Sequence, residues 1–385
     1  MKYTKEHFKS HKALGEERFA QLEPLLRQKV ADGVTAAQSS SDVRTVAKLT
    51  AQELQFVAKD MPLVKQPSDL EKLPETLGKK KEFAFSPLFS PELVDHCCRR
   101  GIFPLTLEVK RGVFVFAPKL HTERAVVRLV DEPMAPIPSQ SFEDGASPPA
   151  LFDPRDCQAK SKVANKCVFY INRPEDLSEA LQLIHLQHGE NWLCAPLRAC
   201  VVEMLRHPDA YETKMTLFIV RTKPSPRAVD GDDAPASAEG ELVAAELGYI
   251  VGDIYTSATG AYRASGCGTL QLAVLGVWLA SIGVRIWDLG MQLDYKERCL
   301  NTVLLPRNKW LQLVAARRAL ISGDLVQQAR ILSALQHHGP QSCSIPQGNK
   351  DHRGNNVTGA PTSKPNRDSD VAPAAALATA APPAA

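Results

Sequence analysis

The segment that decides the fold is residues 241–289, ELVAAELGYIVGDIYTSATGAYRASGCGTLQLAVLGVWLASIGVRIWDL. It begins with two apolar stretches typical of paired strands, which meet at Gly252. A glycine-containing loop, an apolar helix and a buried strand follow. In chain order, the expected elements are strands at 242–251 and 253–257, a loop at 260–268, a helix at 269–282 and a strand at 284–289. The outer strands should be parallel, because a helix of this length is a suitable crossover.

The loop before the helix carries Gly266 and Gly268. Glycines allow a tight turn with exposed N–H groups, and the helix N-terminus adds partial positive charge. The loop therefore predicts either an anion site or simply a tight turn. The pattern Arg263-x-x-Gly266-x-Gly268 resembles the acyl-CoA pyrophosphate loop of GNAT acyltransferases. In that setting Arg263 fits either a phosphate contact or a salt bridge at the helix start.

Short motifs along the chain also resemble those of leucyl/phenylalanyl-tRNA–protein transferases. They occur in the family order over residues 86–315: RGIFP at 100–104, FAP at 116–118, RAVV at 124–127, NWL at 191–193, ELV at 241–243, IWD at 286–288 and LPR at 305–307. The resemblance implies an α/β fold of the GNAT type. It also implies transfer of an amino acid from aminoacyl-tRNA to an acceptor protein N-terminus, with no cofactor. In that family the reaction feeds N-terminal-residue-dependent protein degradation.

Aminolysis of an ester requires a group that accepts the amine proton and donors for the carbonyl oxygen. The family residue matching Asp288 belongs to a catalytic relay, whereas a capping Asp before Gly290 is the structural alternative. Gly290 stands where the family has Gln, so Gln292 is the nearest substitute for the second catalytic residue. Ala258 stands where the family has an acidic residue.

Aromatic and hydroxyl side chains are candidates for substrate binding. Trp192 either stacks on the 3′ adenosine, a contact worth ~1–3 kcal/mol per base, or belongs to the core. Phe116 has the same two interpretations. Tyr255 and Ser257 either polarise the carbonyl or are ordinary strand residues. The full set of substrate-binding candidates is Trp192, Phe116, Tyr255, Ser257, Arg263, Gly266 and Gly268.

Composition shifts divide the chain. We expect a helical N-terminal arm, a small N-terminal α/β unit and a GNAT-like domain that contains a low-complexity loop. A Pro- and Ala-rich tail is expected to be disordered, because it lacks large apolar residues. The corresponding ranges are 1–82, 83–155, 165–325 with its loop at 222–240, and 337–385.

The overall composition argues against several classes of protein. The formal charge of +3 is not that of a protein that coats duplex nucleic acid. The nine cysteines have no zinc-site spacing, so we expect no metal and reduced thiols. The apolar stretch 270–282 is too short to span a bilayer, and Glu6, Glu16 and Glu17 argue against a transit peptide. A cytoplasmic protein without a membrane partner is expected.

Two other functions remain open. An acyl-CoA-dependent N-acyltransferase would use the same fold, and the glycine loop supports it. A non-catalytic binding relative is the second alternative, because Gly290 and Ala258 depart from the relay.

If the chain binds charged tRNA, the affinity should fall as salt concentration rises, because phosphate contacts release counterions. Filter binding at several salt concentrations measures this. An affinity that stays flat between low and moderate salt would contradict an RNA substrate.

Overall fold

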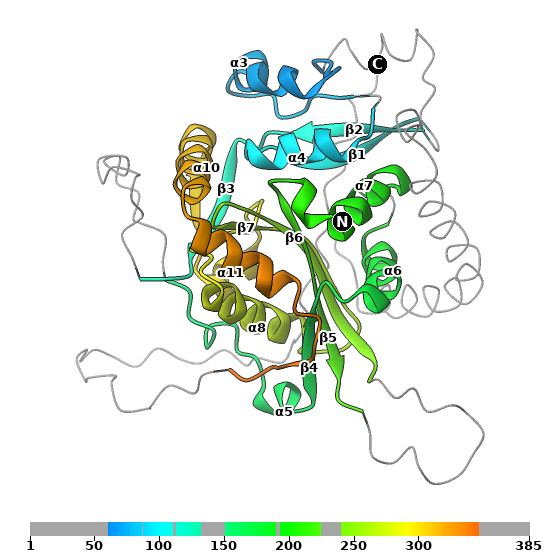
Figure 1. Cartoon of the computed structure of the whole chain (residues 1–385), viewed down its shortest axis with the longest axis vertical. Helices are drawn as coiled ribbons and strands as arrows, with labels where there is room; N and C mark the ends of the chain where they lie inside the picture. Colours follow the sequence, from blue (N-terminus) through cyan, green and yellow to red (C-terminus); the bar gives the residue numbers. More distant parts are fainter. Residues whose placement is uncertain are drawn as a thin grey trace, which may run out of the picture.

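The computed structural model describes residues 61–86, 88–110, 113–131, 151–189, 193–224 and 240–345, which form a mixed α/β fold around an eight-stranded sheet (Figure 1). The strand order is β10-β4-β5-β6-β7-β8-β3-β9. In chain order these strands are β3 (Glu123–Arg128), β4 (Cys167–Ile171), β5 (Lys214–Thr222), β6 (Leu242–Val251), β7 (Ile254–Tyr262), β8 (Ile286–Asp288), β9 (Val303–Pro306) and β10 (Gln341–Ser342). Neighbours in this sheet are antiparallel except for β7 and β8, which are parallel.

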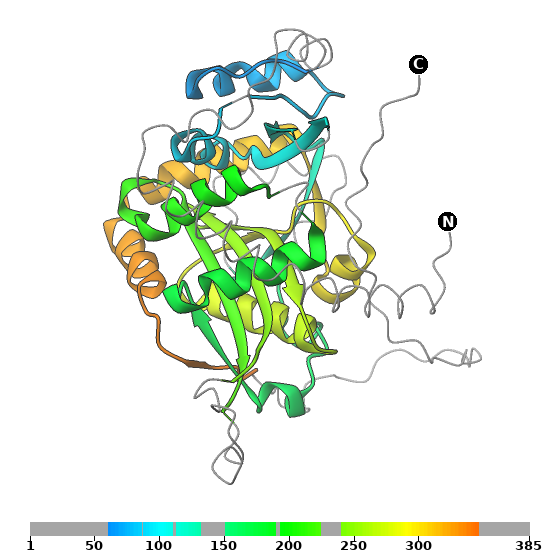
Figure 2. The ribbon, with the colours of Figure 1, turned by 90° about the vertical axis from the view of Figure 1, so that its right-hand side faces the viewer.

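Helices cover both faces of the sheet (Figure 2). Apolar side chains of α4 (Pro91–Arg99), α6 (Leu177–His188) and α7 (Ala195–Arg206) share one buried cluster with Leu247 and Tyr249 of β6. Side chains of α8 (Cys267–Ser281) and α11 (Leu325–Leu335) share another cluster with Ala244 and Ile250 of the same strand. Every residue of β6 is buried, and successive side chains of a strand point to opposite faces, so helices cover this strand on both faces of the sheet.

The deciding segment folds in the predicted order, and the predicted α/β class is confirmed. The predicted helix is α8, and the outer strands β7 and β8 are parallel. However, β7 continues to Tyr262, where a loop was expected, because it stays paired with β6 as far as Ala244. Gly266 has φ +81° at the N-cap of α8, a conformation that glycine adopts without strain.

The part of the chain before residue 155 contributes to the same sheet. Of its strands, β1 (Phe103–Lys110) and β2 (Val113–Lys119) form a separate two-stranded antiparallel sheet, whereas β3 lies between β8 and β9 in the large sheet. The sheet therefore crosses the expected boundary between 83–155 and 165–325. A local sequence pattern cannot reveal this pairing, because the two strands lie far apart in the chain. Arg124 of β3 and Asp288 of β8, which are hydrogen-bonded, are separated by 164 residues.

The remaining elements are short apart from one long helix, whose Trp310, Leu313 and Val314 share a buried cluster with Val126 of β3 and Ile286 of β8. They are η1 (Pro67–Lys72), α3 (Leu73–Leu77), α5 (Ser161–Ala164), η3 (Pro174–Asp176), η4 (Pro208–Ala210), α9 (Asp294–Leu300) and α10 (Arg307–Ser322). The expected disorder from residue 337 is wrong for residues 337–345. In that stretch β10 pairs with β4, Cys343 is buried and Ile345 packs on the same cluster, so backbone pairing and two apolar side chains hold a largely polar segment. Residues 1–60, most of the loop 222–240, and 346–385 lie outside the described residues.

Gly276 of α8 allows the helix to pack closely on Phe152. A Cβ at this position would overlap the ring of Phe152, so Gly276→Val should destabilise the fold by ~1–3 kcal/mol through overpacking. Thermal unfolding measures the effect. Ala280→Val introduces valine into the same helix at a half-buried position and should cost less. Equal losses for the two variants would mean that the Phe152 contact is unimportant.

Candidate functional site

β7 and β8 run together for only three residue pairs and then separate. The last pair joins Thr256 to Asp288, where β8 ends, whereas β7 continues to Tyr262. A bulge places Ala258 as an extra residue between the pairs Gly248–Ser257 and Leu247–Thr259. Residues 257–260 are half-buried, so this part of β7 is accessible from outside. Ligands of α/β sheets commonly bind at the carboxyl ends of strands, where β8 stops here.

Beside this separation lies a buried carboxylate, Glu246, which the sequence analysis missed. It is 2% exposed, and its Oε1 accepts hydrogen bonds from Tyr255 Oη (3.2 Å) and from Ser257 Oγ. Its Oε2 accepts from Gln271 Nε2 at 2.7 Å. Trp287 Nε1 in turn donates to Ser257 Oγ at 2.8 Å. Burial raises the pKa of Glu246 from 4.5 to about 7, although these hydrogen bonds oppose the shift.

Two glycines make room for this polar cluster. A Cβ at Gly248 would overlap the hydroxyl of Tyr255. A Cβ at Gly260 would lie 3.0 Å from Gln271 Nε2 and 3.4 Å from Glu246 Oε2. The sequence did contain one signal of this cluster, a single Glu within the apolar run LVAAELGYIV. A buried charge is costly without partners, so such a residue indicates a polar cluster around it.

Asp288 lies on the other face of the sheet and is fully buried. Arg124 Nε donates to its Oδ1 at 2.9 Å, and Arg124 Nη2 donates to its Oδ2. Thr256 Oγ1 donates to Oδ2 at 2.9 Å, and the Gly290 N–H donates to Oδ1 at 3.0 Å. These contacts join β3, β7 and β8 to the turn that follows. Arg124 also contacts His121 Nδ1 at 2.8 Å, and burial with the Arg124 charge lowers the pKa of His121 well below its ordinary value.

Tyr255 and Asp288 face opposite sides of the sheet. Tyr255 pairs with Trp287 across the two strands, whereas Thr256 pairs with Asp288. Successive side chains of a strand point to opposite faces, so Tyr255 and Ser257 bind Glu246 instead.

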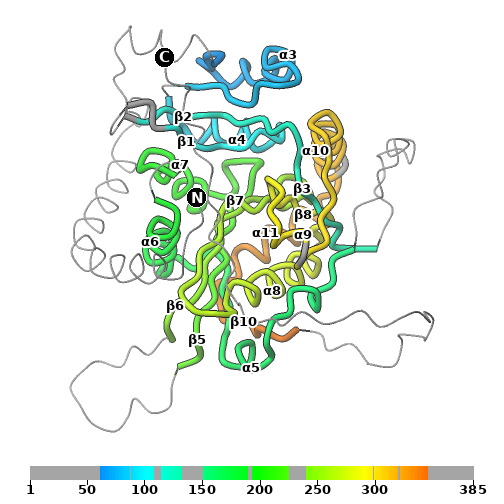
Figure 3. Tube along the Cα trace, turned by 180° about the vertical axis from the view of Figure 1, so that it is seen from behind, coloured from blue at the N-terminus to red at the C-terminus, as the bar shows by residue number. Residues whose placement is uncertain are grey.

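Lys296 of α9 lies beyond the end of β8, and Figure 3 shows α9 beside β8 and α8. Its Nζ donates to the carbonyl oxygens of Leu289 and Met291, the latter at 3.0 Å. Burial lowers the pKa of Lys296 to about 8, with Asp288 and Glu246 opposing the shift. Lys296 is therefore within electrostatic reach of both carboxylates, which lie on opposite faces of the sheet.

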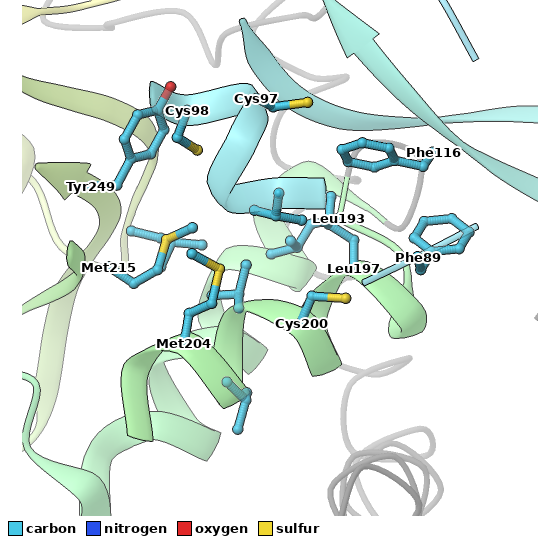
Figure 4. Close-up of a cluster of buried hydrophobic side chains, with 14 of the residues drawn as sticks. Phe89, Cys97, Cys98, Phe116, Leu193, Leu197, Cys200, Met204, Met215 and Tyr249 are labelled. Carbon is cyan, nitrogen blue, oxygen red and sulfur yellow. The ribbon is translucent and has the colours of Figure 1, made fainter. Parts of the chain in front are cut away.

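The other predicted site residues lie apart from this cluster or are engaged elsewhere. Gln292 is exposed, and its amide donates to Glu297 Oε2 at 3.2 Å. Phe116 is fully buried against Phe89, with the rings edge to face at 6.0 Å (Figure 4). That position favours the core interpretation of Phe116. Trp192 lies outside the described residues.

The glycine loop before α8 is a tight turn in this structure. Arg263 forms ion pairs with Glu179 at 3.4 Å and Glu241 at 3.9 Å, which favours the salt-bridge interpretation of this residue. A Cβ at Gly268 would meet the Tyr262 ring at 3.0 Å, so the ring packs against the backbone there.

The described part of the chain contains no group of three or more His, Cys, Asp or Glu residues placed to hold a metal ion. Among the same residues, no helix is long and apolar enough to cross a membrane.

Comparison with known proteins gives weak structural matches. No protein-family model matches the chain, and no curated protein matches it. The crystal structure of FemX matches at 12% identity over 48% of this chain and 60% of that one, with a TM-score of 0.31. The C-terminal domain (DUF2156) of a protein described as a lysylphosphatidylglycerol synthetase from Agrobacterium fabrum matches at 11% identity over 67% and 79%, with a TM-score of 0.26. The match thus spans about three fifths of the FemX chain.

The raised pKa of Glu246 predicts a pH-dependent stability. A carboxyl whose pKa is higher in the folded than in the unfolded chain stabilises the fold at low pH, and this contribution is lost as pH rises from about 4.5 through about 7. Glu246→Gln should therefore unfold at a higher temperature than the wild type at pH 8, with the difference shrinking towards pH 5. Thermal unfolding at several pH values measures it. A difference that is independent of pH would contradict the assignment.

Proposed function

We propose that this chain transfers an aminoacyl group from charged tRNA to the N-terminal amine of an acceptor protein. The motifs that resemble leucyl/phenylalanyl-tRNA–protein transferases support the choice of donor and acceptor. Leucine or phenylalanine as the transferred residue, and a role in protein turnover, rest on that resemblance alone. The proposed reaction is aminolysis, in which the amine attacks the ester carbonyl and the ribose oxygen leaves.

The observation that carries the proposal is the hydrogen bond from half-buried Ser257 to buried Glu246. Glu246 is too enclosed to touch a substrate, but Ser257 lies on the part of β7 that β8 leaves uncovered. A hydroxyl has two acceptor lone pairs, of which Trp287 uses one. The other can accept the amine proton while Ser257 passes its own proton to Glu246. A base with a pKa of about 7 is well suited to this transfer at neutral pH.

Asp288 has a different role in this proposal. Its carboxylate is held by Arg124, Thr256 and the Gly290 N–H, so it positions the end of β8 and the turn after it. Among the described residues, Gln292, the other predicted catalytic residue, donates its hydrogen bond to Glu297 and not to Asp288.

An acyl-CoA-dependent N-acyltransferase is the second candidate. It is favoured by the left-handed Gly266 at the N-cap of the 15-residue α8, since a glycine turn at a helix N-terminus is suited to an anion. It is weakened by Arg263, whose guanidinium already pairs with two carboxylates.

A transfer assay separates these functions. Radiolabelled phenylalanyl-tRNA or leucyl-tRNA should label a peptide with a free N-terminus but not its N-acetylated form, whereas labelled acetyl-CoA should label neither. Glu246→Gln should lower turnover by ~10²–10⁴-fold, the range for lost acid–base help, while tRNA affinity stays unchanged. Full activity of this variant would exclude Glu246 as the proton acceptor.

Asp288→Asn is the matched control, because it also replaces a buried carboxylate with an amide. It leaves the buried Arg124 charge without its partner, and removing one member of a buried pair costs about 3–5 kcal/mol. Its main effect should therefore be a lower thermal midpoint. An Asp288→Asn protein that is stable yet inactive would instead favour Asp288 as the catalytic base.

A further inference from the structure

We propose that Lys296 is the general acid that protonates the ribose oxygen leaving the ester, an inference that rests on the proposed function. Loss of that oxygen as an alkoxide is unfavourable, so aminolysis of an ester gains from a proton donor at the leaving atom as well as from a base at the amine.

The location of Lys296 supports this role. Two of its three N–H groups donate to the carbonyl oxygens of Leu289 and Met291, which fixes the amine directly beyond the end of β8. Its third N–H has no hydrogen-bond partner among the residues that the structure describes, and the Tyr295 ring centroid lies 5.9 Å from Nζ, so a substrate atom can accept from this N–H. Lys296 is 9% exposed against 2% for Glu246, so Lys296 is the less enclosed of the two residues.

The charges around Lys296 come from several elements. Asp288 of β8 and Glu246 of β6 favour the ammonium form of Lys296, whereas Arg124 of β3 disfavours it. The charge of Lys296 also helps to lower the pKa of His121, which favours a neutral imidazole. Burial lowers the pKa of Lys296 to about 8, so the group is mostly protonated at neutral pH and yet gives up a proton readily.

The proton balance closes over one turnover. The acceptor nitrogen forms a bond to the carbonyl carbon, and its proton passes through Ser257 to Glu246. The bond from that carbon to the ribose 3′ oxygen breaks, and the oxygen takes a proton from Lys296. Glu246 is then protonated and Lys296 neutral, and proton exchange with water restores both.

The test compares two phenylalanyl-tRNAs that differ in one atom at the 3′ position of the terminal adenosine, oxygen in one and sulfur in the other. A thiolate leaves without protonation, because thiols have a pKa near 8.5. Lys296→Met should lower turnover from the oxygen ester by ~10²–10⁴-fold and from the thioester by less than ~10-fold. Lys296→Arg should show the same pattern although it keeps the charge, because a guanidinium does not release its proton.

Each outcome decides a separate point. Equal losses with both donors in folded variants, checked by circular dichroism, would overturn the general-acid role. Full activity of Lys296→Arg with the oxygen ester would also overturn it, since charge alone would then suffice. A wild-type protein that uses neither donor would refute the proposed function itself, and this inference with it.

Discussion

The ion pair between Arg124 and Asp288 is the interaction on which the rest of this structure depends. Both side chains are buried, and Arg124 is also enclosed by the rings of Phe103 and Trp310, at 5.6 and 5.3 Å from the guanidinium carbon. Charges removed from water are tolerated only when every partner is in place. The pair therefore fixes β3 against β8 and holds the N-terminal part of the chain in the same sheet as the later strands.

The same carboxylate also shapes the candidate site. It accepts the N–H of Gly290, which has a φ of +74° and whose carbonyl oxygen accepts the Ala125 N–H of β3, so the chain turns just after β8. That turn brings the carbonyl groups of Leu289 and Met291 to Lys296. β8 consequently ends after three residues, and β7 continues without it. The half-buried stretch 257–260 is thus the part of β7 that lies beyond the end of β8.

Sequence patterns predicted the central elements well because their signal is local. Apolar length and spacing located α8 and the strands around it, and the tight turn at Gly266 followed from glycine chemistry. The pairing of β3 with β8 could not be predicted in this way, because its partners are far apart in sequence. The polar cluster was missed for another reason. Glu246, Tyr255, Ser257 and Gln271 come from β6, β7 and α8, and only their packing brings them together. Asp288 was singled out as a relay or capping residue and Arg124 only as part of a family motif, so their ion pair was not predicted.

The two buried carboxylates differ in what surrounds them, and this difference decides their chemistry. Asp288 is compensated by a full positive charge at hydrogen-bond distance, so it is one half of a buried ion pair with Arg124. Glu246 is surrounded by neutral donors, Tyr255, Ser257 and Gln271, which solvate the ionised form without compensating its charge. Either protonation state is therefore accessible to Glu246 near neutral pH, as its raised pKa of about 7 indicates. A carboxylate held in this way can accept a proton and release it in each turnover, whereas one paired with a buried arginine is suited to holding strands together.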